Sequence, residues 1–180
     1  KWNTNWIKEI FRVLKNTGGI YLLTDWHHSG MYHSLLSESF NIQTRITWKN
    51  RKQKNNNVNP TWIEKSADIW FATKSNDFLF NQKAVNVKSD KKDFLEKQND
   101  SNIWIDIPKP IDENSRKPIE VFTKIIQASS FKLNWILDPF MATGDIGVAS
   151  KLSGRRYIGF ESDKDRLLLA MKRIDRQNIK

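Results

Sequence analysis

The residues best suited to chemistry lie in the last quarter of the chain, where two carboxylates flank a glycine-bearing turn. Asp138 ends one apolar run, Gly144 follows in a turn of small residues, and Glu161 ends a second apolar run about 20 residues later. A glycine turn lets the backbone approach a ligand closely, and a carboxylate at a strand end can accept hydrogen bonds from a ribose diol. This spacing predicts an adenosine-containing ligand over the carboxyl ends of two strands.

Other ligand classes are disfavoured by residues that the sequence lacks. It contains no G-x-G-x-x-G for a nicotinamide dinucleotide, and no Gly-Lys-Ser/Thr follows the turn as in a P-loop. The absence of cysteine excludes a disulfide scaffold and Cys-ligated zinc, and we expect no metal site. His27 and His28 are predicted to be surface or packing residues, because the sequence suggests no carboxylate partner for either.

The charge balance favours a polyanionic partner. Lys plus Arg number 30 and Asp plus Glu number 20, so the net charge is +10, which most simply indicates nucleic acid. An Asn- and Lys-rich composition is the alternative source of that surplus. A basic segment between Trp48 and Trp62 is expected to contact the phosphates of a nucleic acid, unless it is an ordinary solvated loop. Its cationic side chains are Lys49, Arg51, Lys52 and Lys54.

The elements that position the glycine turn form a βαβ unit. Strands are predicted at 135–137 and 157–160 with a helix at 148–152 between them, and a further helix begins at Lys117-Pro118. The last helix, at 164–176, is expected to face inward through Leu167, Leu168, Ala170, Met171 and Ile174. Strand, glycine turn, helix, strand and terminal acid make an α/β fold of Rossmann type.

The first half of the chain also mixes helices and strands. Helices are predicted at 6–14 and 31–39, strands at 42–48 and 67–73, and an apolar run at 20–24 is typical of a buried parallel strand. From 74 to about 111 the pattern weakens into polar, lysine-rich segments. Because no apolar run approaches the roughly 20 residues that span a bilayer, and no signal peptide is visible, we expect a cytoplasmic protein without a membrane partner.

The motifs carry a family resemblance. The segment LDPFMATGDIGVA (137–149), followed by GRRYIGFE (154–161), resembles the S-adenosylmethionine-binding segment of the amino-group DNA methyltransferases, roughly L-D-P-F-x-G-[ST]-G-[ST]-T-x-x-A and then G-R-x-[FY]-I-G-x-E. Upstream, EIFRVLK (9–15), TDW (24–26) and IWFATK (69–74) match segments that follow that family's catalytic motif. With the cofactor strand last, the order resembles the circularly permuted β-type enzymes of restriction–modification systems.

The resemblance implies a fold, a reaction and roles for residues. The fold would be a permuted, Rossmann-like class I methyltransferase domain over 1–180, with a target-recognition insertion at roughly 50–110. It would bind S-adenosylmethionine and double-stranded DNA and methylate adenine N6 or cytosine N4 of a flipped-out base, adenine being favoured. The cofactor-binding residues would be Asp138, Phe140, Ala142, Gly144, Glu161 and Lys117, with Asp25 bordering the active site. The alternative for Asp138 is a residue that only caps a turn before Pro139.

The chain also departs from the family pattern. Ala142 stands where the pattern has glycine, and Asp145 stands where it has Ser or Thr, although an acid there can cap a helix. The catalytic motif [DNS]-P-P-[YFW] is absent, since there is no Pro-Pro, and is expected before Lys1. The catalytic residues are therefore unknown, and the chain alone is expected to be inactive. A split subunit or homodimer, a degenerate DNA-binding homologue and an unrelated nucleotide-binding domain remain alternatives.

Overall fold

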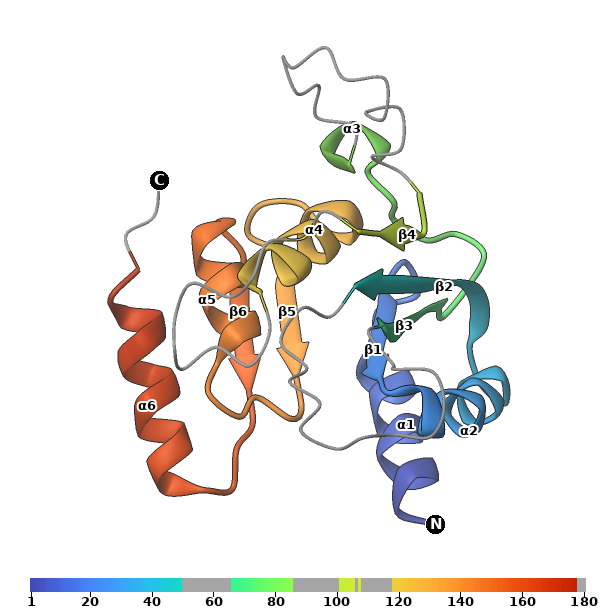
Figure 1. Ribbon diagram of the computed structural model, residues 1–180, viewed down its shortest axis with the longest axis horizontal. Helices are drawn as coiled ribbons and strands as arrows, with labels where there is room; N and C mark the ends of the chain where they lie inside the picture. Colours follow the sequence, from blue (N-terminus) through green and yellow to red (C-terminus); the bar gives the residue numbers. More distant parts are fainter. Residues whose placement is uncertain (50–65, 86–100, 106, 108–117, 178–180) are drawn as a thin grey trace, which may run out of the picture. The chain divides into compact units, whose positions relative to one another are not determined.

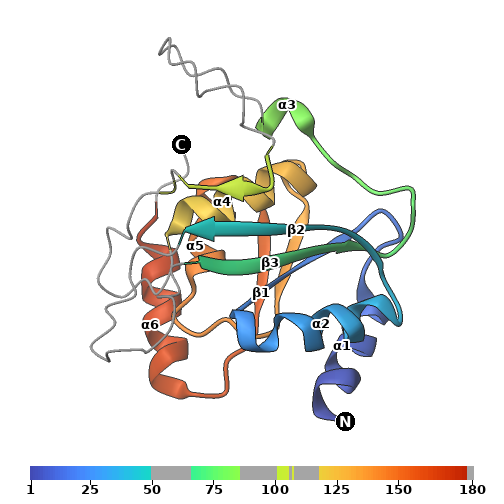
Figure 2. The ribbon, with the colours of Figure 1, turned by 45° about the vertical axis from the view of Figure 1, so that its right-hand side comes forward.

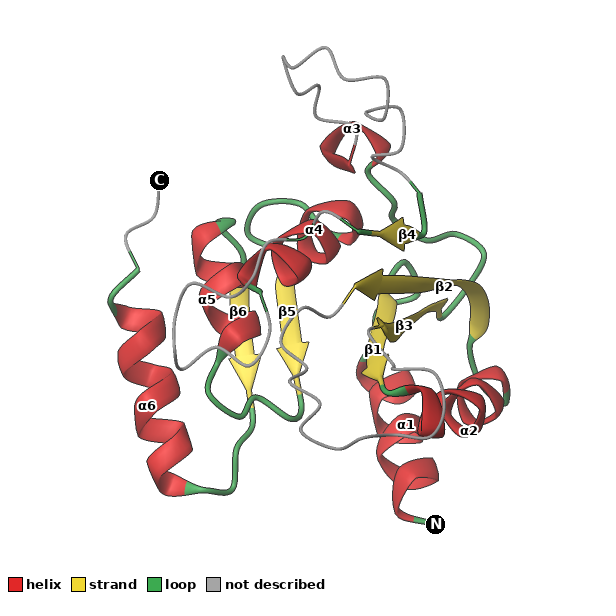
Figure 3. Cartoon of the chain, viewed as in Figure 1, coloured by secondary structure: helices red, strands yellow, loops and turns green. Residues whose placement is uncertain are grey.

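The computed structural model describes residues 1–49, 66–85, 101–105, 107 and 118–177 (Figure 1). The chain divides into two compact units, Lys1–Leu79 with Asp100–Asp106 and Phe80–Asn99 with Ile107–Lys180. Each unit combines strands with helices, as Figure 3 shows by colour, so the α/β class is confirmed. None of the helices in these described ranges is long and apolar enough to cross a membrane.

The first unit is built on a mixed sheet with the strand order β1-β3-β2-β4. Its strands are β1 (Gly19–Thr24), β2 (Asn41–Lys49), β3 (Ser66–Thr73) and β4 (Ile103–Trp104). β3 runs antiparallel to both β1 and β2, and β4 adds to β2 in parallel, as Figure 2 shows. β1 and β2 therefore point the same way, so their carboxyl ends share one edge of this sheet.

Two helices pack on one another and on this sheet. They are α1 (Trp2–Val13) and α2 (Trp26–Ser37). Apolar residues at helical spacing place Ile7 and Leu36 in a buried cluster with Phe40 and Ala72. Because α2 follows β1 directly, this packing fixes the chain at the carboxyl end of β1.

The second unit carries the predicted βαβ segment. β5 (Trp135–Asp138) and β6 (Arg156–Gly159) pair in parallel, and α5 (Asp145–Leu152) connects them. The short helix α3 (Gln82–Val85) and the helices α4 (Ile119–Ser129) and α6 (Lys164–Asp175) complete the described part of this unit. Its buried apolar side chains come mainly from these helices and include Val121, Phe122, Ile125, Val148, Ala149 and Ala170.

Several predicted elements required correction. The 20–24 segment is a strand, but its described partner is the antiparallel β3, because an apolar run reports burial and not strand direction. α2 begins at Trp26 rather than 31, and α5 at Asp145 rather than 148. On α6, Leu168 and Met171 are exposed. The predicted weak region contains α3 and β4, and the expected recognition insertion falls largely outside the described residues.

Candidate cofactor site

Parallel pairing brings the predicted cofactor residues of the second unit together. Asp138 lies opposite Gly159 in the β5–β6 register. The Phe160 N–H donates to the Asp138 carbonyl at 3.0 Å, and the Met141 N–H donates to the Phe160 carbonyl at 3.0 Å. Backbone hydrogen bonds thus join the segment that follows β5 to the segment that follows β6. This places the glycine turn beside the segment that leads into Glu161, as the sequence predicts.

The Asp138 carboxylate is buried and fully engaged by the protein. The Phe140 N–H donates to Oδ1 at 3.1 Å, and the Tyr157 hydroxyl donates to Oδ2 at 3.1 Å. Burial raises the pKa of the Asp138 carboxyl, against these two hydrogen bonds. Burial likewise raises the pKa of the Tyr157 hydroxyl, and the negative charge of Asp138 raises it further. Asp138 therefore caps the turn after β5, the alternative that the sequence left open.

The turn between β5 and α5 has left-handed backbone at two positions. Ala142 has φ 48° and Gly144 has φ 84°. A β-carbon on Gly144 would lie 2.9 Å from the Ala170 Cβ, so only glycine fits where the turn approaches α6. Ala142 adopts a backbone conformation that glycine adopts freely. Its methyl group is the one clear cost of the departure from the family pattern.

The outer part of the site has groups available to a ligand. The Phe140 side chain is 51% exposed at the start of the turn. Glu161 accepts the Asp163 N–H through Oε1 at 2.9 Å, and Oε2 takes no hydrogen bond from any residue that the structure describes. An aromatic face, a turn with left-handed backbone and a carboxylate with a free oxygen fit an adenosine-containing cofactor.

Arg173 is a functional candidate that the sequence did not reveal. Its guanidinium is buried on α6 and donates from Nη2 to Asp145 Oδ1 at 2.9 Å and from Nη1 to the Thr143 carbonyl. Hydrophobic periodicity placed Leu168 and Met171 on the inner face of this helix instead. The sequence did contain one sign of Arg173, because the unusual acid Asp145 at the start of α5 suggests a cationic partner.

Asp25 lies at the carboxyl end of β1 in the first unit. Its Oδ1 accepts the His28 N–H at 3.0 Å and lies 2.8 Å from His28 Nδ1, so Asp25 caps α2. Burial opposes ionisation, but the hydrogen bonds from His28 prevail and lower the pKa of the Asp25 carboxyl. His28 therefore has a carboxylate partner, contrary to the sequence prediction, because a helix cap brings residues three apart together.

Of the remaining predicted residues, only Lys49 is among those that the structure describes. Lys49 is exposed at the end of β2, whereas Arg51, Lys52, Lys54 and Lys117 lie outside the described residues. Within the described part of the chain, no cluster of three or more His, Cys, Asp or Glu side chains could hold a metal ion.

Comparison with known proteins decides the family. The model of the family N6_N4_Mtase, described as DNA methylase, matches residues 1–172. The chain belongs to the DNA methylase family. A relative of this DNA methylase, the type II methyltransferase M2.DpnII of Streptococcus pneumoniae, is 29% identical over 99% of the chain and 68% of its own length. The DNA adenine methyltransferase YhdJ of Escherichia coli is 23% identical over 97% of the chain and 66% of its own length.

A solved structure supports the fold independently. The crystal structure of an M1.HpyAVI–SAM complex aligns with a TM-score of 0.74 at 21% identity, covering 96% of this DNA methylase and 81% of that chain. At this identity the likeness shows the fold, which is the Rossmann-like class I methyltransferase fold that the sequence predicted. The predicted amino-group DNA methyltransferase kinship is confirmed, and S-adenosylmethionine is the cofactor of that family.

Proposed function

We propose that this DNA methylase chain forms the cofactor-binding and DNA-facing part of a site-specific methyltransferase of restriction–modification type. The reaction would move a methyl group from S-adenosylmethionine to the exocyclic amine of a flipped-out base. The first candidate for this amine is adenine N6. The observation that carries this proposal is the family match over 1–172, which includes both halves of the cofactor segment.

Each site residue receives a role from its surroundings. Glu161 would accept hydrogen bonds from the ribose hydroxyls through its unengaged oxygen. Phe140 would cover one face of the bound molecule, and the 142–145 backbone would lie against its methionine part. Asp138 would act indirectly, because both of its oxygens already hold the turn and Tyr157. Lys117 and Asp25 stay as proposed neighbours of the site.

The chemistry requires little more than correct placement. S-adenosylmethionine supplies an activated methyl group whose carbon–sulfur bond breaks as a carbon–nitrogen bond forms, and the amine then loses one proton. The target base must first leave the duplex stack, since pairing buries its amine. The protein would align donor and acceptor, while cations such as Lys49, with Arg51, Lys52 and Lys54, would contact phosphates. These cations lie in or beside the segment proposed for target recognition.

Adenine is proposed as the target because a relative along almost the whole chain is named a DNA adenine methyltransferase. The family model spans both N6 and N4 acceptors, so cytosine N4 is the second candidate. A third candidate is a non-catalytic DNA-binding or partner subunit. The methyl group of Ala142 and the carboxylate of Asp145, both at the cofactor turn, favour that candidate.

The test combines binding, transfer and product analysis. We expect the 180-residue chain to bind S-adenosylmethionine in a calorimeter but to transfer no tritiated methyl group to DNA, because it has no [DNS]-P-P-[YFW] motif. Joining the chain to an upstream segment with that motif, or adding a partner subunit that carries it, should restore transfer. Digestion of the product to nucleosides then separates N6-methyladenine from N4-methylcytosine. Absence of cofactor binding would favour the non-catalytic candidate, and tritium incorporation by the chain alone would contradict the expected inactivity.

A further inference from the structure

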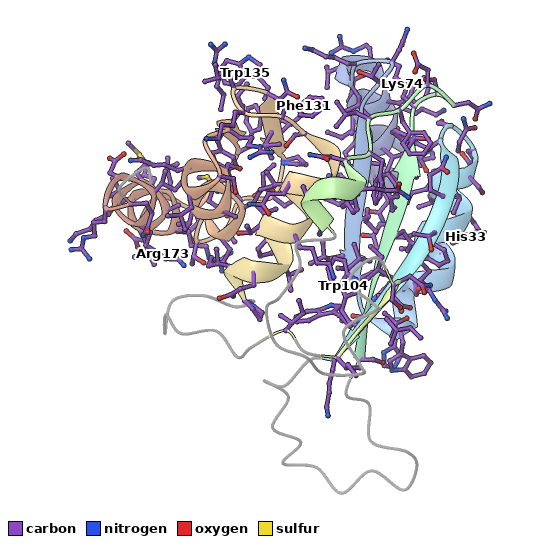
Figure 4. The ribbon with its side chains drawn as sticks, turned by 90° about the horizontal axis from the view of Figure 1, so that it is seen from above. His33, Lys74, Trp104, Phe131, Trp135 and Arg173 are labelled. Atoms are coloured by element: carbon purple, nitrogen blue, oxygen red, sulfur yellow. The ribbon has the colours of Figure 1, made fainter. Side chains whose placement is uncertain are left out.

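A buried ion pair lies directly behind the cofactor turn. Arg173 is 6% exposed and Asp145 is 9% exposed, and the two side chains meet at 2.9 Å between Nη2 and Oδ1. Figure 4 labels Arg173 on α6. Burial of two charges removes their hydration, so such a pair adds little net stability even when it is well bonded. A geometric role therefore explains its presence better than stability does.

The pair holds the turn from both sides of Gly144. One nitrogen of the Arg173 guanidinium donates to the carbonyl of Thr143, before Gly144, and the other bonds Asp145, after it. The planar, forked guanidinium fixes two acceptors in one orientation, which a lysine ammonium cannot do. α6 thereby fixes the direction of the peptide groups between positions 142 and 145.

This turn is also where the chain departs from the family motif twice. Ala142 holds φ 48°, a left-handed conformation that costs a residue with a β-carbon about 1–2 kcal/mol. Asp145 is buried at the start of α5, where the positive end of the helix dipole compensates only part of its charge. The guanidinium addresses both departures, because it neutralises Asp145 and holds the backbone next to Ala142.

We propose that Arg173 is a positioning residue for S-adenosylmethionine binding, which acts through Thr143 and Asp145 without contacting the cofactor itself. It would keep the turn in the shape that accepts the methionine part of the cofactor and would make Ala142 tolerable there. The inference rests on the proposed function. It distinguishes the methionine end, which would lie against this turn, from the ribose end, which Glu161 would hold.

The test measures two ligands against paired variants. Calorimetry would compare S-adenosylmethionine with 5′-methylthioadenosine, which keeps the adenosine and sulfur but lacks the amino-acid part. In Arg173→Met/Asp145→Ser both charges are removed together, so no buried charge is left unpaired and the fold should survive. We expect this variant to bind S-adenosylmethionine about 10-fold more weakly, with 5′-methylthioadenosine affinity changed by less than about threefold.

Further variants separate positioning from folding. Arg173→Lys should give an intermediate loss, and adding Ala142→Gly to the double variant should restore part of the affinity by relaxing the left-handed position. Equal weakening of both ligands, or unchanged S-adenosylmethionine affinity in the double variant, would overturn the positioning role alone. A wild-type chain that binds neither ligand would overturn the proposed function, and this inference with it.

Discussion

The hydrogen bond between Tyr157 and Asp138 supports a quantitative prediction about the second unit. Tyr157→Phe keeps the ring and removes the hydroxyl that donates to Asp138 Oδ2 at 3.1 Å. A hydrogen bond to a charged group contributes about 1.5–3 kcal/mol. Because Tyr157 is only half-buried and water can replace part of the contact, we expect a loss of local unfolding free energy of about 1–2 kcal/mol at neutral pH.

The predicted loss depends on pH with a definite sign. Burial raises the pKa of Asp138 above its ordinary 3.8, so the folded state holds this proton more tightly than the unfolded state. That contribution to stability is present at low pH and is lost as the pH rises through the folded pKa. Removing the hydroxyl raises the folded pKa further. The penalty of Tyr157→Phe should therefore be smaller near pH 4 than near pH 7.

The measurement needs a local probe, because a chain of two units does not guarantee two-state unfolding. Hydrogen exchange followed by mass spectrometry on peptides from 135–160 reports the β5–β6 unit directly. Tyr32→Phe is the matched control, since Tyr32 is half-buried in the first unit and its hydroxyl makes no hydrogen bond to any described residue. The reasoning would be refuted if Tyr157→Phe lost no more unfolding free energy than Tyr32→Phe, or if its loss did not grow with pH.

Three further predictions concern the same elements. Asp138→Asn should leave the opening free energy of β5 peptides, obtained from exchange after correction for the intrinsic pH dependence of the exchange rate, nearly independent of pH between about 4 and 7, because the titrating group is gone; a retained pH slope in that free energy would exclude Asp138 as its source. Gly144→Ala should destabilise the second unit by about 2 kcal/mol or more, since its β-carbon would crowd Ala170 at a left-handed position; hydrogen exchange of the 135–160 peptides, compared between variant and wild type, checks this. Asp25→Ala should lower the free energy of unfolding of α2 by about 1 kcal/mol at neutral pH, and by less in acid, where the Asp25 carboxyl of the wild type is protonated. Equal hydrogen exchange of the His28 backbone amide in both proteins at pH 7 would contradict the capping role.

The spacing of apolar residues along the chain predicted most elements, because a helix or strand that is buried on one face repeats apolar residues at its own period. β5 was predicted at 135–137 and runs Trp135–Asp138, and α6 was predicted at 164–176 and runs Lys164–Asp175. The start of α2 was missed because its first turn carries no apolar stripe, Trp26 being exposed, and is fixed by the Asp25 cap instead. The position of β3 between β1 and β2 was also missed, since strand order depends on long-range pairing.

The candidate cofactor site shows the same division between local and long-range information. Asp138, Gly144 and Glu161 could be predicted because a strand, a turn and a second strand determine their placement along the chain. Periodicity could not find Arg173, because it assigns a cation to the solvent face unless a partner charge is known. That partner, Asp145, was noticed as a departure from the motif, but its pairing spans two helices.

The path of the chain through the two units has a consequence for dividing the protein. β4 belongs to the first unit, where the Thr47 N–H donates to the Asn102 carbonyl at 2.8 Å and Trp104 is buried. Along the chain, however, β4 is preceded and followed by segments of the second unit. A break after Leu79 would leave one fragment with an open strand edge and the other with the strand that fits it. Separately produced fragments of this chain should therefore recombine by strand complementation, with β4 as the docking peptide.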